Sequence, residues 1–158
     1  MNAPPLWHPA SLIATWFGSG LLPRAPGTWG SLAALPFAFA LQWRGGWLAL
    51  AMGALVVLVL GCWAIGVYLR DAEESDPGRV VVDEVFGQFL ALLPASTDPL
   101  LFALAFAMFR LFDIWKPWPV GWADRQFHGP IGVMLDDGIA GLYAAAGIVG
   151  LRVLGIGA

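Results

Sequence analysis

The sequence predicts an all-α, polytopic helical membrane protein of about five helices, with residues 1–158 forming a single membrane-embedded domain. Hydrophobic residues make up 59% of the chain and charged residues only 12%, about half the share of roughly 25% found in soluble domains. The mean hydropathy is +0.73. A soluble protein of this length needs more polar side chains than these to cover its surface. The charges also leave a long uncharged run between Arg44 and Arg70.

That uncharged run, Gly45 to Leu69, is the clearest helix in the sequence. At about 1.5 Å per residue it reaches roughly 37 Å, which exceeds the roughly 30 Å of a bilayer's hydrocarbon core. We therefore expect it to cross a membrane. The uncharged segment before it, Thr28 to Trp43, is shorter and contains Pro36. This pattern predicts a kinked or partly inserted first helix, with Gly45-Gly46 as the turn between the two.

Three further apolar segments follow. The segments Val85–Leu93 and Leu100–Phe109 are joined by PASTDP, whose turn residues predict a short helical hairpin packed against the long helix. The last segment, Gly138–Leu154, predicts the final helix. Its small residues form a stripe that lets another helix approach closely; they are Ala140, Gly141, Ala144 and Ala145.

Helices that alternate in direction place ten of the eleven acidic residues at one membrane face, which we call the active face, and only Asp98 opposite. Some of these acids, Asp71, Glu73 and Glu74, are most simply explained as a solvated loop. The basic residues are also unequally divided, with Arg24, Arg70, Arg79, Lys116 and Arg125 at the active face against Arg44 and Arg152 opposite. The positive-inside rule then predicts that the active face is cytoplasmic.

Five acidic residues lie within apolar sequence at this face, where an unpaired carboxylate is costly. They are Asp83 and Glu84 in VVVDEVFGQ, Asp113 in FRLFDIWKPWP, and Asp136 and Asp137 in VMLDDGIAG. Carboxylates from three chain regions suit a hard divalent cation, Mg²⁺ first. Structural explanations remain open. A helix N-terminus stabilises an acid at Asp83 or at Asp136-Asp137, and Asp113 has Arg110 or Lys116 within reach for a salt bridge.

Candidate substrate-binding residues occur in two loops. In GSGLLPRAPGTWGSL, a loop rich in glycine and proline opens a helix, where backbone N–H groups, Arg24, Thr28 and Ser31 can bind an anion. The loop is not a Walker A motif, because no Gly-Lys-Ser/Thr occurs.

The second loop is DIWKPWPVGWADRQFHG. Lys116 and Arg125 are candidate phosphate ligands there, and Asp124 or His128 is a candidate proton-transfer group. A snorkelling lysine and a lone loop histidine are the structural alternatives.

Several function classes are excluded by composition. The net charge of −3 provides no basic surface for nucleic acid, so we expect no nucleic-acid partner. Cys62 is the only cysteine and lacks the Cys-x₅-Arg context of a cysteine phosphatase, and no D-x-D nucleophile motif occurs. The N-terminus lacks the positive charge expected before the apolar stretch of a signal peptide.

Taken in order, three segments resemble the phosphatidylglycerophosphatase A family of bacterial membrane phosphatases. They are FGSGLLPRAPGTWGSL, VVVDEVFG and FRLFDIWKPWPVGWADRQFHGPIGVMLDDGIAG, within residues 17–141. The resemblance implies magnesium-dependent hydrolysis of phosphatidylglycerophosphate to phosphatidylglycerol and inorganic phosphate, at the cytoplasmic side of the inner membrane. It matches Asp83, Glu84, Asp113, Asp136 and Asp137 to the family's acidic positions, and Arg24, Thr28 and Lys116 to its phosphate-contact positions. Val82 departs from the tryptophan that many members carry.

The predicted chemistry is attack by metal-activated water, with Thr28 as the alternative nucleophile. The catalytic residues are then expected to be Asp83, Asp113, Lys116, Asp124 and Asp137. Two alternatives remain. One is a transporter or ion-binding membrane protein, against which the clustering of acids at one face argues. The other is a CDP-alcohol phosphotransferase, whose D-G-x₂-A-R run is absent after Asp137-Gly138.

Overall fold

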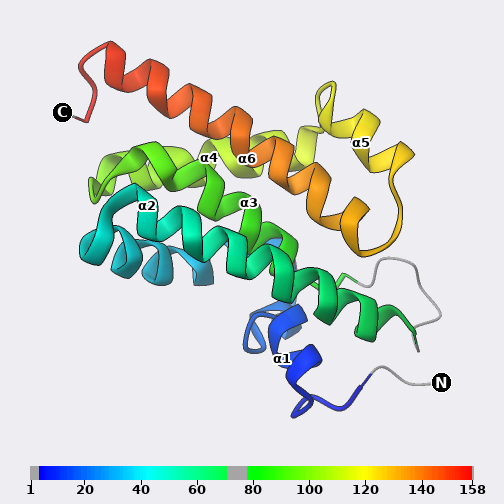
Figure 1. Cartoon of the computed structure of the whole chain (residues 1–158). Coiled ribbons are helices and arrows are strands. Elements are labelled where there is room, and N and C mark those ends of the chain that lie inside the picture. Colours follow the sequence, from blue (N-terminus) through cyan, green and yellow to red (C-terminus); the bar gives the residue numbers. More distant parts are fainter. Residues whose placement is uncertain (1–3, 71–77, 158) are drawn as a thin grey trace.

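The computed structural model describes residues 4–70 and 78–157, and its regular elements there are all helical (Figure 1). The all-α prediction is confirmed. The α-helices are α1 (Pro9–Ala14), α2 (Pro26–Arg70), α3 (Val82–Leu92), α4 (Pro99–Trp115), α5 (Val120–Gln126) and α6 (Gly129–Val153), with short 3₁₀ turns η1 (Ser19–Leu21) and η2 (Leu93–Ala95). The sequence did not predict α1 or α5, since both are only a turn or two long and lie in segments interrupted by proline.

Helix α2 is two helices joined at the predicted glycine turn. Backbone angles leave the helical region at Gly45 (φ −146°, ψ 17°) and Gly46 (φ 63°, ψ −159°), and the positive φ at Gly46 is one that glycine adopts without strain. Figure 1 shows the second half running back beside the first. A Cβ atom on Gly53 would lie 2.6 Å from Leu41 Cδ1, so glycine lets the two halves pack closely. Pro36 lies within helical backbone and does not form the break.

Within the described residues, α2, which comprises two helices, and α6 are long and apolar enough to cross a membrane. Much of the outer surface of α2 is apolar and exposed, including Leu48, Met52, Leu55 and Val59. A continuous apolar surface of this kind is costly in water and is stable against lipid. Together these features indicate membrane association.

Helices α3 and α6 pack closely through glycines. A Cβ on Gly141 would lie 2.3 Å from the carbonyl oxygen of Gly87, and a Cβ on Gly87 would lie 2.6 Å from the carbonyl oxygen of Asp137. The two backbones are therefore in direct contact. The predicted small-residue stripe of the last helix serves this purpose within the chain.

The start of the last helix was predicted wrongly. Helix α6 begins at Gly129, with a proline in its first turn, and not at Gly138. Proline is well tolerated there because the first helical N–H groups have no partner within the helix. Asp136 and Asp137 consequently lie about two turns inside the helix, so its N-terminus does not account for them.

The ends of the helices fall into two groups (Figure 1). The starts of α2, α3 and α6 and the end of α4 lie at one end of the bundle, and the Gly45-Gly46 turn, η2 and the C-terminus lie at the other. Asp98 caps α4 at the second end by accepting hydrogen bonds from the Leu100 and Leu101 N–H groups. Asp71, Glu73, Glu74 and Asp76 lie outside the described residues. The remaining acids lie at the first end, as the sequence predicts for the active face.

The glycine contact between α3 and α6 can be tested by adding one methyl group. Gly141→Ala is expected to lower the stability of the purified protein by roughly 1–3 kcal/mol, because overpacking against the Gly87 carbonyl outweighs the better helix propensity of alanine. Thermal unfolding in detergent measures this. Gly150→Ala is the matched control, since a Cβ there meets nothing within 4 Å. Equal unfolding temperatures for the two variants would contradict the proposed contact.

Candidate active site

A cavity of about 360 Å³ opens at the active end of the bundle, between the starts of α2, α3 and α6 and the end of α4. It brings together residues that are far apart in the chain. The predicted site residues that line it are Asp83, Glu84, Asp113, Lys116, Asp124, His128, Asp136 and Asp137. The alternating helix directions predict that these acidic residues gather at one end of the bundle.

Three of these acids form a set that fits a cation. Asp83, Glu84 and Asp137 each offer a carboxylate oxygen, and these oxygens lie within 4.8 Å of one another. Glu84 Oε2 and Asp137 Oδ2 are buried and have no hydrogen-bond partner among the described residues. Buried anionic oxygens without a partner are costly, and a bound cation removes that cost. An all-carboxylate set suits Mg²⁺ or a similar hard divalent ion.

The position of the Glu84 carboxylate within this set depends on a glycine on α2. A Cβ on Gly27 would lie 2.2 Å from Glu84 Oε1, so only glycine leaves room for the carboxylate. Burial raises the pKa of Glu84 to about 7; a hydrogen bond with Asp83 lowers it in part, and the nearby charge of Asp113 raises it. Glu84 therefore takes up a proton close to neutral pH unless a bound cation keeps it ionised.

Asp113 lines the same cavity but is already paired. Its Oδ2 accepts a hydrogen bond from Arg110 Nη1, one turn earlier on α4, and the two side chains are only 13% and 14% exposed. This is one of the salt bridges that the sequence left open. Asp113 is absent from the three carboxylates that could share a cation.

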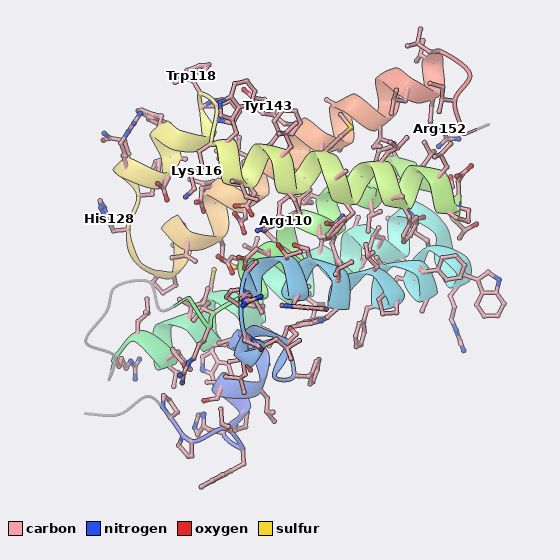
Figure 2. All side chains as sticks on the ribbon, turned by 180° about the vertical axis from the view of Figure 1, so that it is seen from behind. Arg110, Lys116, Trp118, His128, Tyr143 and Arg152 are labelled. Atoms are coloured by element: carbon pink, nitrogen blue, oxygen red, sulfur yellow. The ribbon has the colours of Figure 1, made fainter. Side chains whose placement is uncertain are left out.

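Lys116 organises a second group of charges, beside α5. It ends α4 in the left-handed conformation, with φ 49° and ψ 57°. Its Nζ donates to Asp124 Oδ1 at 2.7 Å and to Asp136 Oδ2 at 3.2 Å. Figure 2 shows Lys116 and His128 toward the α5 side and Arg110 further into the bundle.

These contacts determine the ionisation of both partners. Burial of the Lys116 amine tends to lower its pKa, but the two carboxylates outweigh this effect and the pKa is raised above its usual value. The hydrogen bond from Lys116 in turn holds the pKa of Asp124 below its usual range. Lys116 is therefore a permanent cation, and Asp124 a permanent anion, near neutral pH.

Four predicted substrate-binding residues do not line the cavity: Arg24, Thr28, Ser31 and Arg125. Ser31 is fully buried and its hydroxyl donates to the Gly27 carbonyl at 2.9 Å, so it supports the helix that carries Gly27. Arg24 and Arg125 are exposed, and Thr28 is half-buried. Their contact with substrate stays a prediction.

Comparison with known proteins identifies the family. The family model described as phosphatidylglycerophosphatase A matches residues 12–152. The chain belongs to the phosphatidylglycerophosphatase A family. The resemblance found in the sequence is thus confirmed, and the alternative families are set aside. No solved structure matches the chain.

Individual relatives cover most of the chain. An Escherichia coli K12 phosphatidylglycerophosphatase A is 42% identical over 145 residues, which span 88% of this chain and 79% of the relative. One from Haemophilus influenzae is 38% identical over 141 residues, 88% of this chain and 86% of the relative. A Bacteroides thetaiotaomicron protein, provisionally named a phosphatidylinositol-3-phosphatase, is 43% identical over 140 residues, 84% and 87% of the two chains.

The raised pKa of Glu84 predicts how cation binding depends on pH. A carboxyl must lose its proton to bind a metal ion, so affinity should rise by about tenfold from pH 6 to pH 8 as a group with a pKa of about 7 deprotonates. Calorimetric titration of the purified protein with Mn²⁺ in buffers of different ionisation heat measures both affinity and proton release. An affinity that does not change over this range would contradict the role of Glu84.

Proposed function

We propose that this protein hydrolyses the phosphomonoester of phosphatidylglycerophosphate to phosphatidylglycerol and inorganic phosphate, with Mg²⁺ as cofactor. The observation that carries the proposal is the set of Asp83, Glu84 and Asp137 oxygens beside the Lys116 amine in one cavity. Membership of the phosphatidylglycerophosphatase A family supports the same substrate. On this proposal residues 1–158 form a single membrane-embedded phosphatase domain.

The acidic set would hold the metal. The chemistry that Mg²⁺ supplies when bound is neutralisation of phosphate charge and activation of a water for attack. The oxygens of Glu84 and Asp137 that have no partner among the described residues are the ones available to hold it. Asp113 and Asp136, also predicted as ligands, are instead paired with Arg110 and Lys116.

Lys116 has a role that its contacts support. As a permanent cation facing the cavity, it binds a phosphate oxygen and stabilises charge that develops there during reaction. Its hydrogen bonds to Asp124 and Asp136 hold the flexible side chain in place, so less conformational freedom is lost when substrate binds.

The proton for the leaving glycerol oxygen comes, in this proposal, from His128. Asp124 is held ionised by Lys116 and has no proton to give near neutral pH. His128 lines the cavity at its exposed rim, and histidine is the side chain that most often transfers protons in enzymes. Asp124 thus acts by positioning Lys116.

The membrane arrangement follows from the charges at the two ends. We infer a multi-pass protein of the bacterial inner membrane, with the two halves of α2 and helix α6 as its crossing segments. The end of the bundle that holds the cavity carries Arg24, Arg79, Lys116 and Arg125, and the opposite end carries Arg44 and Arg152. The positive-inside rule therefore supports a cytoplasmic active site.

The metal set is tested by Asp83→Asn and Asp137→Asn. Purified wild-type protein is expected to release phosphate from phosphatidylglycerophosphate only with Mg²⁺, and each variant is expected to lose at least 100-fold in kcat because a ligand charge is gone. Asp98→Asn is the matched control, since asparagine caps a helix as well as aspartate does and Asp98 lies at the far end.

The same assay should include phosphatidylinositol 3-phosphate and soluble phosphomonoesters, because one relative is named for the former. Faster turnover of any of these than of phosphatidylglycerophosphate would reject the proposed substrate. Full activity after removal of divalent ions would reject the metal mechanism.

Asp124→Asn separates the positioning role from proton donation. We expect a loss of roughly tenfold or less in kcat at neutral pH, against the 10²–10⁴-fold expected if Asp124 were the general acid. Because Asp124 holds the Lys116 amine in place, its removal is also expected to raise KM for phosphatidylglycerophosphate. An unchanged KM would show that Asp124 does not act through Lys116.

A further inference from the structure

Arg110 is a largely buried cation to which the mechanism above assigns no role. Its side chain is 14% exposed and does not line the cavity. Nη1 donates to Asp113 Oδ2, and Nε is buried with no hydrogen-bond partner among the described residues. A buried guanidinium is costly unless nearby negative charge compensates for it, so acidic side chains are expected beside Arg110.

Those surroundings include a second acid. A Cβ on Gly27 would lie 2.2 Å from Glu84 Oε1 and 3.2 Å from Arg110 Nη1. The guanidinium that bonds Asp113 and the carboxylate of Glu84 therefore meet at the same glycine. Arg110 lies behind the cavity wall, next to one member of the cation-binding set and bonded to an acid outside it.

We propose that Arg110 is a positioning residue that withholds Asp113 from the divalent cation and holds this carboxylate facing the cavity. Asp113 lines the cavity, yet the oxygens close enough to share a cation belong to Asp83, Glu84 and Asp137. The bond to Arg110 occupies Oδ2 and leaves Oδ1 for the cavity. This inference rests on the proposed phosphatase function.

The charge of the Asp113 carboxylate limits which reactant it can contact in the cavity. It repels a phosphate dianion and so favours a reactant that can donate a hydrogen bond, which here is the attacking water. As the water oxygen bonds to phosphorus, one water proton passes to Asp113. The bond from phosphorus to the glycerol oxygen breaks, and that oxygen takes a proton from His128. The proton on Asp113 is afterwards released to solvent.

The test compares Arg110→Met and Arg110→Lys with Arg44→Met, an exposed arginine at the opposite end that serves as control. The full-length proteins are purified in detergent, with Mn²⁺ binding followed by electron paramagnetic resonance and phosphate release measured at saturating Mg²⁺. Arg110→Met should bind Mn²⁺ severalfold more tightly, because a positive charge is removed and Asp113 becomes a ligand. Its kcat should fall roughly 100-fold, as for loss of a general base.

Arg110→Lys keeps the charge but not the planar guanidinium, so its Mn²⁺ affinity should stay near that of the wild type while kcat falls less. A purely structural arginine would weaken both Mn²⁺ binding and turnover, and an arginine that contacts phosphate would raise KM alone. Either result for Arg110→Met overturns the inference.

Asp113→Asn tests the inference even if Arg110→Met does not fold. It should bind Mn²⁺ within about twofold of the wild type while losing roughly 100-fold in kcat, whereas Asp137→Asn should lose Mn²⁺ binding. A tenfold weaker Mn²⁺ affinity in Asp113→Asn would identify Asp113 as a ligand and reject the inference. Failure of the wild type to bind Mn²⁺ or to release phosphate would instead reject the proposed function.

Discussion

The direct backbone contact between α3 and α6 is the constraint on which the site depends. Gly87 and Gly141 meet with no side chain between them, and the carbonyl of Asp137 lies against Gly87. Only at this separation do the carboxylates of Asp83 and Glu84, from α3, reach that of Asp137. Mutual repulsion of the three acids opposes the contact, so helix packing must supply the free energy that holds them together until a cation binds.

The charges at the active end are divided by their partners. Asp113 is bonded to Arg110, and Asp124 and Asp136 are bonded to Lys116. Glu84 and Asp137 keep buried oxygens with no protein partner among the described residues. In surroundings of low dielectric constant, the presence or absence of a basic partner separates two kinds of acid. Some have their charge compensated by Arg110 or Lys116, and the others suit a metal ion. The six acidic side chains that line the cavity thus form separate groups with different chemistry.

Apolar segments, turn residues and charge placement predicted much of this arrangement. The long uncharged run, the glycine turn at Gly45-Gly46 and the hairpin were predictable from the sequence. Glycine, proline and the length of an apolar segment affect only the local backbone. The start of α6 was not, because a proline that often ends a helix is equally suited to begin one. Ser31 shows the same limit, since a hydroxyl on a helix can face substrate or bond its own backbone, as it does here.

The sequence by itself determined that the chain is helical, apolar enough for a membrane, and acidic at one end, because composition, the length of apolar segments and the placement of charges decide these properties without knowledge of neighbours. Only the tertiary structure decided which carboxylates share a cation and which are paired. Asp136 and Asp137 are adjacent in sequence, yet about 100° separates neighbouring residues around a helix, so Asp136 bonds Lys116 while Asp137 joins Asp83 and Glu84. The partner of each carboxylate depends on which helix packs against that face of α6, and the local sequence does not specify this packing.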